Sequence, residues 1–91
     1  MSADFVKYDL GQLNAGSVVE ITLKHRANVQ LLDASNFARY QRGENFQAVG
    51  GEAVESPVTL EAPNSGHWYV VLDLGGAEGS IESSVRVLSE A

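Results

Sequence analysis

The fold of this chain is decided by one stretch of sequence, SGHWYVVLDLGG at residues 65–76. Glycine turns bound the stretch, and between them side chains alternate across a strand. One face carries Trp68, Val70, Leu72 and Leu74, and the other carries His67, Tyr69, Val71 and Asp73. Because both faces bear large apolar groups, the strand needs cover on both sides. We therefore predict that it is the central strand of the protein.

Further strands are predicted on both sides of this stretch. Alternating apolar residues and turn residues recur roughly every 8–12 residues, the spacing typical of a sandwich or barrel. These strands cover residues 5–10, 17–24, 27–33, 56–62 and 80–88. Residues 46–49 and 52–54 predict a strand that is broken at Gly50-Gly51 by a bulge or bend. Residues 35–41 predict a short helical turn, with Asp33 or Ser35 as its N-cap and Gly43 at its end. We expect a single all-β domain over residues 1–91, a jelly-roll-like antiparallel β-sandwich of about eight short strands.

The inward-facing positions of these strands predict the core. It consists of Val19, Ile21, Leu23, Val29, Leu31, Val58, Leu60, Trp68, Val70, Leu72, Val85 and Val87. Phe37 and Tyr40 stand three residues apart in the helical turn, so they share a face. A helix of two turns is not stable alone, and packing must hold this one in place.

Composition narrows the classes of partner. The chain has 91 residues, a net charge of −6 and no cysteine. Nucleic-acid binding needs clustered basic residues, and here the six are scattered, so we expect no nucleic-acid partner. No apolar run approaches the ~20 residues of a membrane span, and no signal peptide is visible, so we expect no membrane partner. The lack of cysteine fits a reducing compartment, and we predict a cytoplasmic location.

Four blocks of the sequence resemble a small bacterial domain family of unknown function, DUF1883. The blocks are FVKYDLG at residues 5–11, VQLLDASNF at 29–37, SGHWYVV at 65–71 with DLGG at 73–76, and SVRVL at 84–88. A looser similarity, through LLD at 31–33 and GHWYV at 66–70, is to the jelly-roll pre-peptidase C-terminal domains. Some DUF1883 relatives are joined to a TIR domain, which implies an accessory or ligand-sensing role in bacterial signalling or defence. The resemblance supplies no catalytic or ligand-binding residues.

Catalytic motifs are absent from the sequence. It contains no cysteine nucleophile, no Gly-x-Ser-x-Gly elbow and no phosphate-binding loop. His67 shares a strand face with Asp73, but six residues of strand separate them by about 20 Å. An acid–base role for His67, as in a small hydrolase or lyase, would need a carboxylate from a neighbouring strand. We keep that enzyme as an alternative and expect no catalytic residue and no cofactor.

One turn could hold a metal ion. Asp73, Glu78 and Glu82 surround the glycine-rich turn at residues 75–79, whose carbonyls are suitable Ca²⁺ ligands. No spaced Asp-x-Asp-x-Asp loop accompanies them. We therefore carry this turn as a second, weaker site hypothesis.

Aromatic and polar residues around the helical turn predict a binding surface. The candidate surface comprises Asn36, Phe37, Tyr40, Arg42, Glu44, His67 and Tyr69. Sandwich domains bind carbohydrate or peptide through such combinations of rings and polar groups. The structural alternative is that Phe37 and Tyr40 only anchor the helical turn over Tyr69. We predict a non-catalytic binding or interaction module, a monomer or homodimer, whose partner is a protein or a small ligand. A self-associating structural domain is the remaining alternative.

Overall fold

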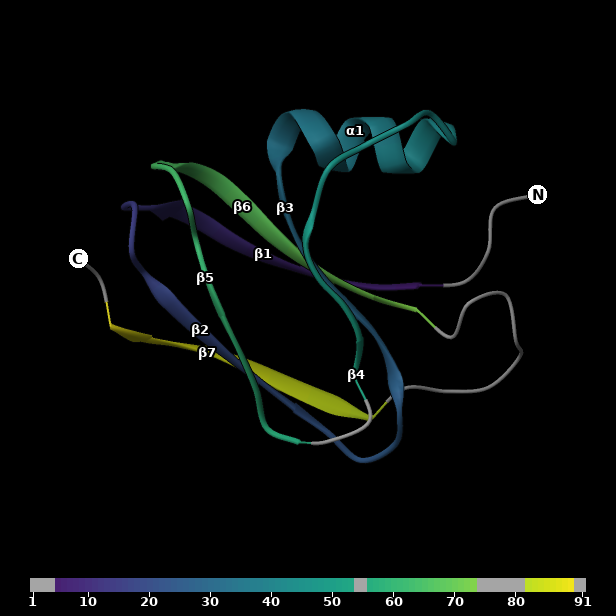
Figure 1. Cartoon of the computed structure of the whole chain (residues 1–91), viewed down its shortest axis with the longest axis vertical. Helices are drawn as coiled ribbons and strands as arrows, with labels where there is room; N and C mark the ends of the chain where they lie inside the picture. The colour runs from purple at the N-terminus through teal and green to yellow at the C-terminus, as the bar shows by residue number, and fades with distance from the viewer. Residues whose placement is uncertain (1–4, 54–55, 74–81, 90–91) are drawn as a thin grey trace.

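The computed structural model describes residues 5–53, 56–73 and 82–89, which form seven strands and one helix (Figure 1). The elements are β1 (Phe5–Leu13), β2 (Val18–Leu23), β3 (Ala27–Asp33), α1 (Ala34–Arg42), β4 (Val49–Ala53), β5 (Val58–Glu61), β6 (Gly66–Asp73) and β7 (Ser83–Ser89). Two antiparallel sheets pack around a shared core, so the predicted all-β sandwich with one short helix is confirmed. The jelly-roll arrangement stays a prediction.

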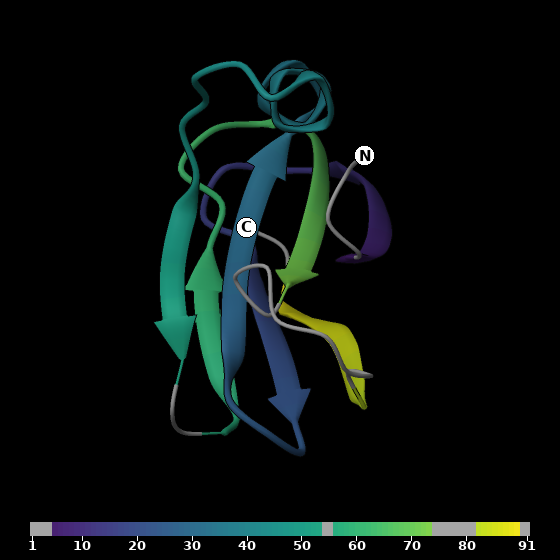
Figure 2. The same ribbon diagram turned by 90° about the vertical axis from the view of Figure 1, so that its right-hand side faces the viewer.

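The strand that we predicted to be central is β6. Its sheet has the order β1-β6-β3-β4, so it lies between two antiparallel neighbours, and the second sheet has the order β5-β2-β7 (Figure 2). Val70 is paired with Tyr8 of β1 on one side and with Leu31 of β3 on the other. This register fixes which side chains of the three strands share a face.

The inner face of β6 forms the main core. Trp68 is 5% exposed, Val70 and Leu72 are fully buried, and they share one cluster with Val19 and Ile21 of β2. Between the sheets, the Tyr8 hydroxyl of β1 also donates to the backbone oxygen of Ser83 at 3.0 Å. The core therefore joins the two sheets face to face.

Helix α1 packs against the outer side of β3 and β6, and Figure 2 shows it nearly end-on. It begins at Asp33, whose carboxylate caps the backbone N–H of Asn36, and it ends at Gly43 in the left-handed region at φ 74°. Glycine adopts that conformation without strain, which explains the stop. Phe37 is buried against Leu32 and Val71, forming a second cluster outside the sandwich.

Two predicted strands have other bounds in the structure, and in the first a glycine explains the difference. Strand β1 does not end before Gly11 but passes through a bulge there, at φ 70°, and continues to Leu13. The strand predicted over residues 46–49 and 52–54 with a break at Gly50-Gly51 is β4, which covers only Val49–Ala53 and runs through both glycines. The structure describes seven strands, where about eight were predicted.

The predicted core is confirmed, with additions. Eight of its residues are buried, namely Val19, Ile21, Leu23, Val29, Leu31, Trp68, Val70 and Leu72. The other four, Val58, Leu60, Val85 and Val87, are partly buried against the same cluster. The prediction missed Leu13, Ala27 and Ala62, which are also buried in it. Leu13 was missed because the strand was expected to end before it.

Candidate functional site

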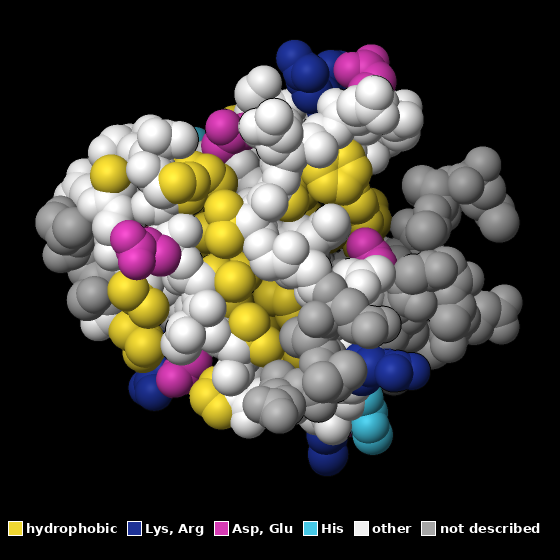
Figure 3. Space-filling view, in the orientation of Figure 1, with side chains coloured by type: hydrophobic (Ala, Val, Ile, Leu, Met, Phe, Trp, Pro, Cys, Tyr) yellow, Lys and Arg dark blue, Asp and Glu magenta, His cyan; other side chains and the backbone are white. Residues whose placement is uncertain are grey.

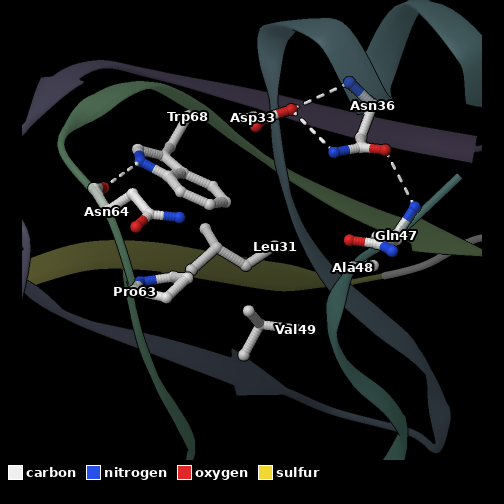
Figure 4. A pocket seen from close by; sticks show the side chains of 9 residues that line it. All are labelled: Leu31, Asp33, Asn36, Gln47, Ala48, Val49, Pro63, Asn64 and Trp68. Atoms are coloured by element: carbon white, nitrogen blue, oxygen red, sulfur yellow. Dashed lines mark hydrogen bonds between the residues drawn. The ribbon is translucent and has the colours of Figure 1, made fainter.

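A pocket opens at one corner of the sandwich, where β3 passes into α1. Nine residues line it: Leu31, Asp33, Asn36, Gln47, Ala48, Val49, Pro63, Asn64 and Trp68 (Figure 4). Its volume is about 160 Å³. They come from β3, β6, the start of α1 and β4, and the two loops before β4 and β6. We call this feature the corner pocket.

The rim of the corner pocket is built by the cap of α1. One carboxylate oxygen of Asp33 accepts hydrogen bonds from the backbone N–H of Asn36 at 2.8 Å and from its side-chain amide at 2.9 Å. The amide oxygen of Asn36 in turn accepts from the backbone N–H of Gln47 at 2.8 Å. Asn36 thus ties the start of the helix to the loop that returns toward β4. These bonds hold the rim in one arrangement.

The floor of the corner pocket is apolar and belongs to the core. Leu31 is fully buried, and the Trp68 indole N–H donates to the backbone oxygen of Asn64 at 2.9 Å. At Gly50, a Cβ would collide with the backbone oxygen of Val29 and lie 3.2 Å from Leu60 of β5. Glycine at this position therefore lets the backbone of β3 and the Leu60 side chain of β5 approach β4 closely. Hydrophobic side chains are visible between these two strands in the space-filling view (Figure 3).

Three polar groups on the rim have no hydrogen-bond partner among the described residues. They are the second carboxylate oxygen of Asp33 and the side-chain amides of Gln47 and Asn64. In Figure 4 this oxygen of Asp33 is turned away from Asn36, toward the side of Trp68. Gln47 and Asn64 use their backbone groups for the structural bonds, so their side chains are free to bind a ligand.

The aromatic residues of the predicted surface mostly hold α1 in place. Phe37 is only 6% exposed, and its ring stacks on Tyr69 with centroids 4.4 Å apart. Tyr40 makes edge-to-face contacts with Phe5 at 5.3 Å and with Phe46 at 5.2 Å. This geometry matches the structural alternative for Phe37 and Tyr40. Binding of a partner by these seven residues stays a prediction.

Tyr40 is also held by a hydrogen bond. Its hydroxyl donates to Asp73 at 3.0 Å, and the other oxygen of Asp73 accepts from the Asn28 amide at 2.8 Å. Burial, the hydrogen bond to Asp73 and the charge of Asp73 together raise the pKa of Tyr40 to about 12. Tyr40 is therefore neutral over the physiological range and acts as a donor.

Arg42 and Glu44 pair with each other beyond the end of α1. The guanidinium donates twice to the carboxylate, at 3.1 Å each, and both side chains are more than half exposed. Pairing raises the pKa of Arg42 and lowers that of Glu44. Because both side chains are exposed, solvent screens the pair and it adds little to stability.

His67 meets a carboxylate from the neighbouring strand. Its Nε2 lies 2.6 Å from Asp9 of β1, and its ring centroid is 4.9 Å from that of Tyr69. The bulge in β1 positions Asp9, which also accepts from the backbone N–H of Gly11 at 2.9 Å. That bond, with a smaller contribution from His67, lowers the pKa of Asp9. The pair is exposed on the outer face of the sheet. It lies next to Tyr69, the ring on which Phe37 of α1 stacks.

The structure divides the seven predicted surface residues between separate places. Asn36 reaches the corner pocket, His67 and Tyr69 lie on the outer face of β6, and the Arg42–Glu44 pair follows α1. The prediction missed Asp33, Gln47, Asn64 and Trp68 as members of one pocket. Asp33 and Trp68 were predicted in structural roles, as a cap and a core residue. Gln47 and Asn64 lie in loops whose course the alternation of side chains does not indicate.

The metal hypothesis stays a prediction. Asp73 is engaged by Tyr40 and Asn28, Glu82 pairs with Lys24 at 3.2 Å, and Glu78 lies outside the described residues. Among the residues that the structure describes, no three acidic, histidine or cysteine side chains are grouped to hold a metal ion. No helix in this part of the chain is long and apolar enough to cross a membrane.

These features define a small all-β sandwich with one packed helix and a pocket at its corner. The chain belongs to the DUF1883 family: the family described as "Domain of unknown function (DUF1883)" matches residues 3–91. The predicted membership is thereby confirmed. Comparison with curated proteins and with solved structures gave no match.

Proposed function

We propose that this DUF1883 domain is a non-catalytic binding module that holds a small ligand in the corner pocket. The observation that carries the proposal is the convergence of three free polar groups over an apolar floor. These groups are one oxygen of Asp33 and the amides of Gln47 and Asn64, and the floor includes Leu31 and Trp68. Ligand sites typically combine apolar walls with a few placed polar groups.

The test removes the free amides without touching the scaffold. In Gln47→Ala and Asn64→Ala the backbone bonds to Asn36 and Trp68 remain, so unfolding free energies should change by less than about 0.5 kcal/mol. Labelled protein is titrated with a library of neutral, acidic and basic small molecules while amide and indole NMR shifts are recorded. We expect at least one compound to shift the NMR resonances of Trp68 and its neighbours. Both variants should bind that compound more weakly than the parent protein does.

The control is Gln12→Ala, which removes an exposed amide outside the corner pocket. It should bind the hit as the parent protein does. If no compound of any class shifts the pocket resonances, the proposed site is wrong.

The setting that we propose is a cytoplasmic accessory or ligand-sensing module in bacterial signalling or defence. Its support is the composition of the chain and the TIR-linked relatives implied by the family resemblance. A protein partner, in place of a small ligand, would be consistent with the same setting.

A small hydrolase or lyase that uses His67 is the second candidate. The 2.6 Å contact between His67 and Asp9 supplies the cross-strand carboxylate that such an enzyme would need. His67 does not line the corner pocket, and it is 42% exposed in its side chain. The enzyme hypothesis requires that the protein turns over a substrate and that His67→Ala abolishes this turnover without unfolding the protein.

Self-association is the third candidate. Strand β7 is an edge of its sheet, and its Leu88 is 45% exposed. Exposed edges with apolar side chains are ready sites for strand pairing. A solution mass of twice the chain mass, which Leu88→Lys returns to the monomer value, would support this role. A monomeric parent protein would remove it.

A further inference from the structure

The corner pocket also indicates the chemistry of its ligand. We infer that it takes a neutral hydroxylated ring, such as one sugar residue, an inference that rests on the proposed function. The size of the pocket is the first reason. At about 160 Å³ it is smaller than the ~300–1,000 Å³ of sites for drug-sized ligands, so it fits a single ring.

The polar groups of the rim match hydroxyls. The amides of Gln47 and Asn64 each offer donors and an acceptor, and the free oxygen of Asp33 is an acceptor. A hydroxyl both donates and accepts, so adjacent hydroxyls on a ring can use all of these groups. An ammonium group only donates and would leave the amide N–H groups unused.

Charge around the pocket favours a neutral ligand. Asp33 is the one charged residue among the described residues that line it, so an anion would be repelled. A cation would meet the N-terminal end of α1, which carries about half a positive charge. The carboxylate of Asp33 already interacts with that helix end, because it accepts a hydrogen bond from the backbone N–H of Asn36.

The floor and the shape of the pocket favour a ring over an extended peptide. Val49 and Pro63 offer an aliphatic surface on which the C–H face of a sugar can rest beside Trp68. A peptide strand would need a groove several residues long. Here Leu60 of β5 packs close to Gly50 of β4, beside Val49 of the pocket.

Further sugar residues have a place outside the pocket. A second, polar depression shares Asp33, Asn36 and Gln47 with the corner pocket and extends to Arg39 and Asn45 of the helix and the following loop. A second ring attached to the first would enter this depression. We therefore expect a disaccharide to bind more tightly than its monosaccharide.

The experiment is an NMR titration with six probes. Glucose, galactose and N-acetylglucosamine are the neutral rings, glucuronate is the anion, glucosamine is the cation, and trialanine is the peptide. We expect at least one neutral ring to shift the Trp68 indole N–H and the side-chain amides of Gln47 and Asn64, whereas the charged sugars and the peptide do not.

The matched variant is Asp33→Asn. Asparagine is as good an N-cap as aspartate, so α1 should be retained, while the free carboxylate oxygen is lost. A hydrogen bond to a charged group contributes enough that we expect the dissociation constant of the sugar to rise at least about tenfold. Asn45→Ala, which lines only the outer depression, should leave monosaccharide binding unchanged and weaken the disaccharide.

Each result has a distinct meaning. Shifts caused by glucuronate, glucosamine or trialanine at the pocket would overturn the sugar inference and leave the binding module standing. Sugar shifts elsewhere, or shifts unaffected by Asp33→Asn, would overturn it as well. If these probes and the wider library all fail to shift the pocket, the sugar inference and the proposed function fall together.

Discussion

The two faces of β6 are covered in different ways. Its inner face, with Trp68, Val70 and Leu72, packs against a second sheet and is 5% exposed or less. Its outer face, with Tyr69 and Val71, is covered by a single nine-residue helix. The side chains that alternate along β6 are thus covered almost completely by a sheet on one side and only partly by a helix on the other.

This difference in cover determines how each face of β6 is held and which of its side chains are exposed to solvent. A helix as short as α1 does not persist alone, so the ring contacts of Phe37 and Tyr40 and the hydrogen bond from Tyr40 to Asp73 keep it on the sheet. The helix covers Val71 completely, Tyr69 in part, and leaves His67 exposed. The inner face instead borders the corner pocket at Trp68.

The largest expected effect comes from breaking the inner face. Trp68→Ala removes the indole from the core together with its hydrogen bond to Asn64, and we expect a loss of about 3–5 kcal/mol in the free energy of unfolding. Small domains have about 5–15 kcal/mol in total, so the variant should be close to unfolding. Urea denaturation followed by circular dichroism measures the loss.

The control for Trp68 is another large apolar residue that the core does not contain. Leu88→Ala removes a side chain that is 45% exposed on β7, and it should change stability by less than about 0.5 kcal/mol. A Trp68→Ala variant as stable as Leu88→Ala would mean that the inner face is not the main core.

A smaller and more local effect is expected on the outer face. Phe37→Ala removes the ring that stacks on Tyr69 and packs against Leu32 and Val71. We expect the free energy of unfolding to fall by about 3 kcal/mol. Because a helix as short as α1 needs packing to persist even with its caps, the variant should lose helix signal in circular dichroism before its sheets unfold. Arg39→Ala, on the exposed side of the helix, is the matched control. A single cooperative transition in Phe37→Ala would show that both faces form one unit.

The contrast between the faces also explains what the sequence could predict. Alternation in β6 and in β2 assigned the inner core, because strand periodicity directly indicates which side chains share a face. The caps at Asp33 and Gly43 located α1, because both residue types satisfy helix ends by local chemistry. Such local signals do not depend on the rest of the fold.

The site was less predictable because it depends on distant parts of the chain. The corner pocket joins Asp33 to Asn64 and Gln47, and only the pairing of β3 with β6 and β4 brings those loops together. The His67–Asp9 contact depends on a bulge at Gly11, which shifts the register of β1 by one residue. A glycine after a strand is equally typical of a turn, so the sequence did not distinguish the two.

The smallest effect expected here separates the hydrogen bond of Tyr40 from its ring contacts. Tyr40→Phe keeps the ring against Phe5 and Phe46 but removes the bond to Asp73, and we expect a loss of about 1 kcal/mol at neutral pH. The effect should depend on pH. Since the folded pKa of about 12 exceeds the ordinary value of 10.0, this stability is fully present below pH 10 and is lost as pH rises toward 12.

Two measurements follow the contribution of Tyr40. Absorbance titration of tyrosinate in the parent protein and in Tyr40→Phe gives a difference curve, which should have its midpoint near pH 12. Denaturation of both proteins between pH 8 and pH 11 should show the parent losing its advantage only above about pH 10. A difference curve centred at the ordinary value of 10.0 would mean that Tyr40 is not held by Asp73. The outer face would then depend on the ring contacts of Phe37 and Tyr40.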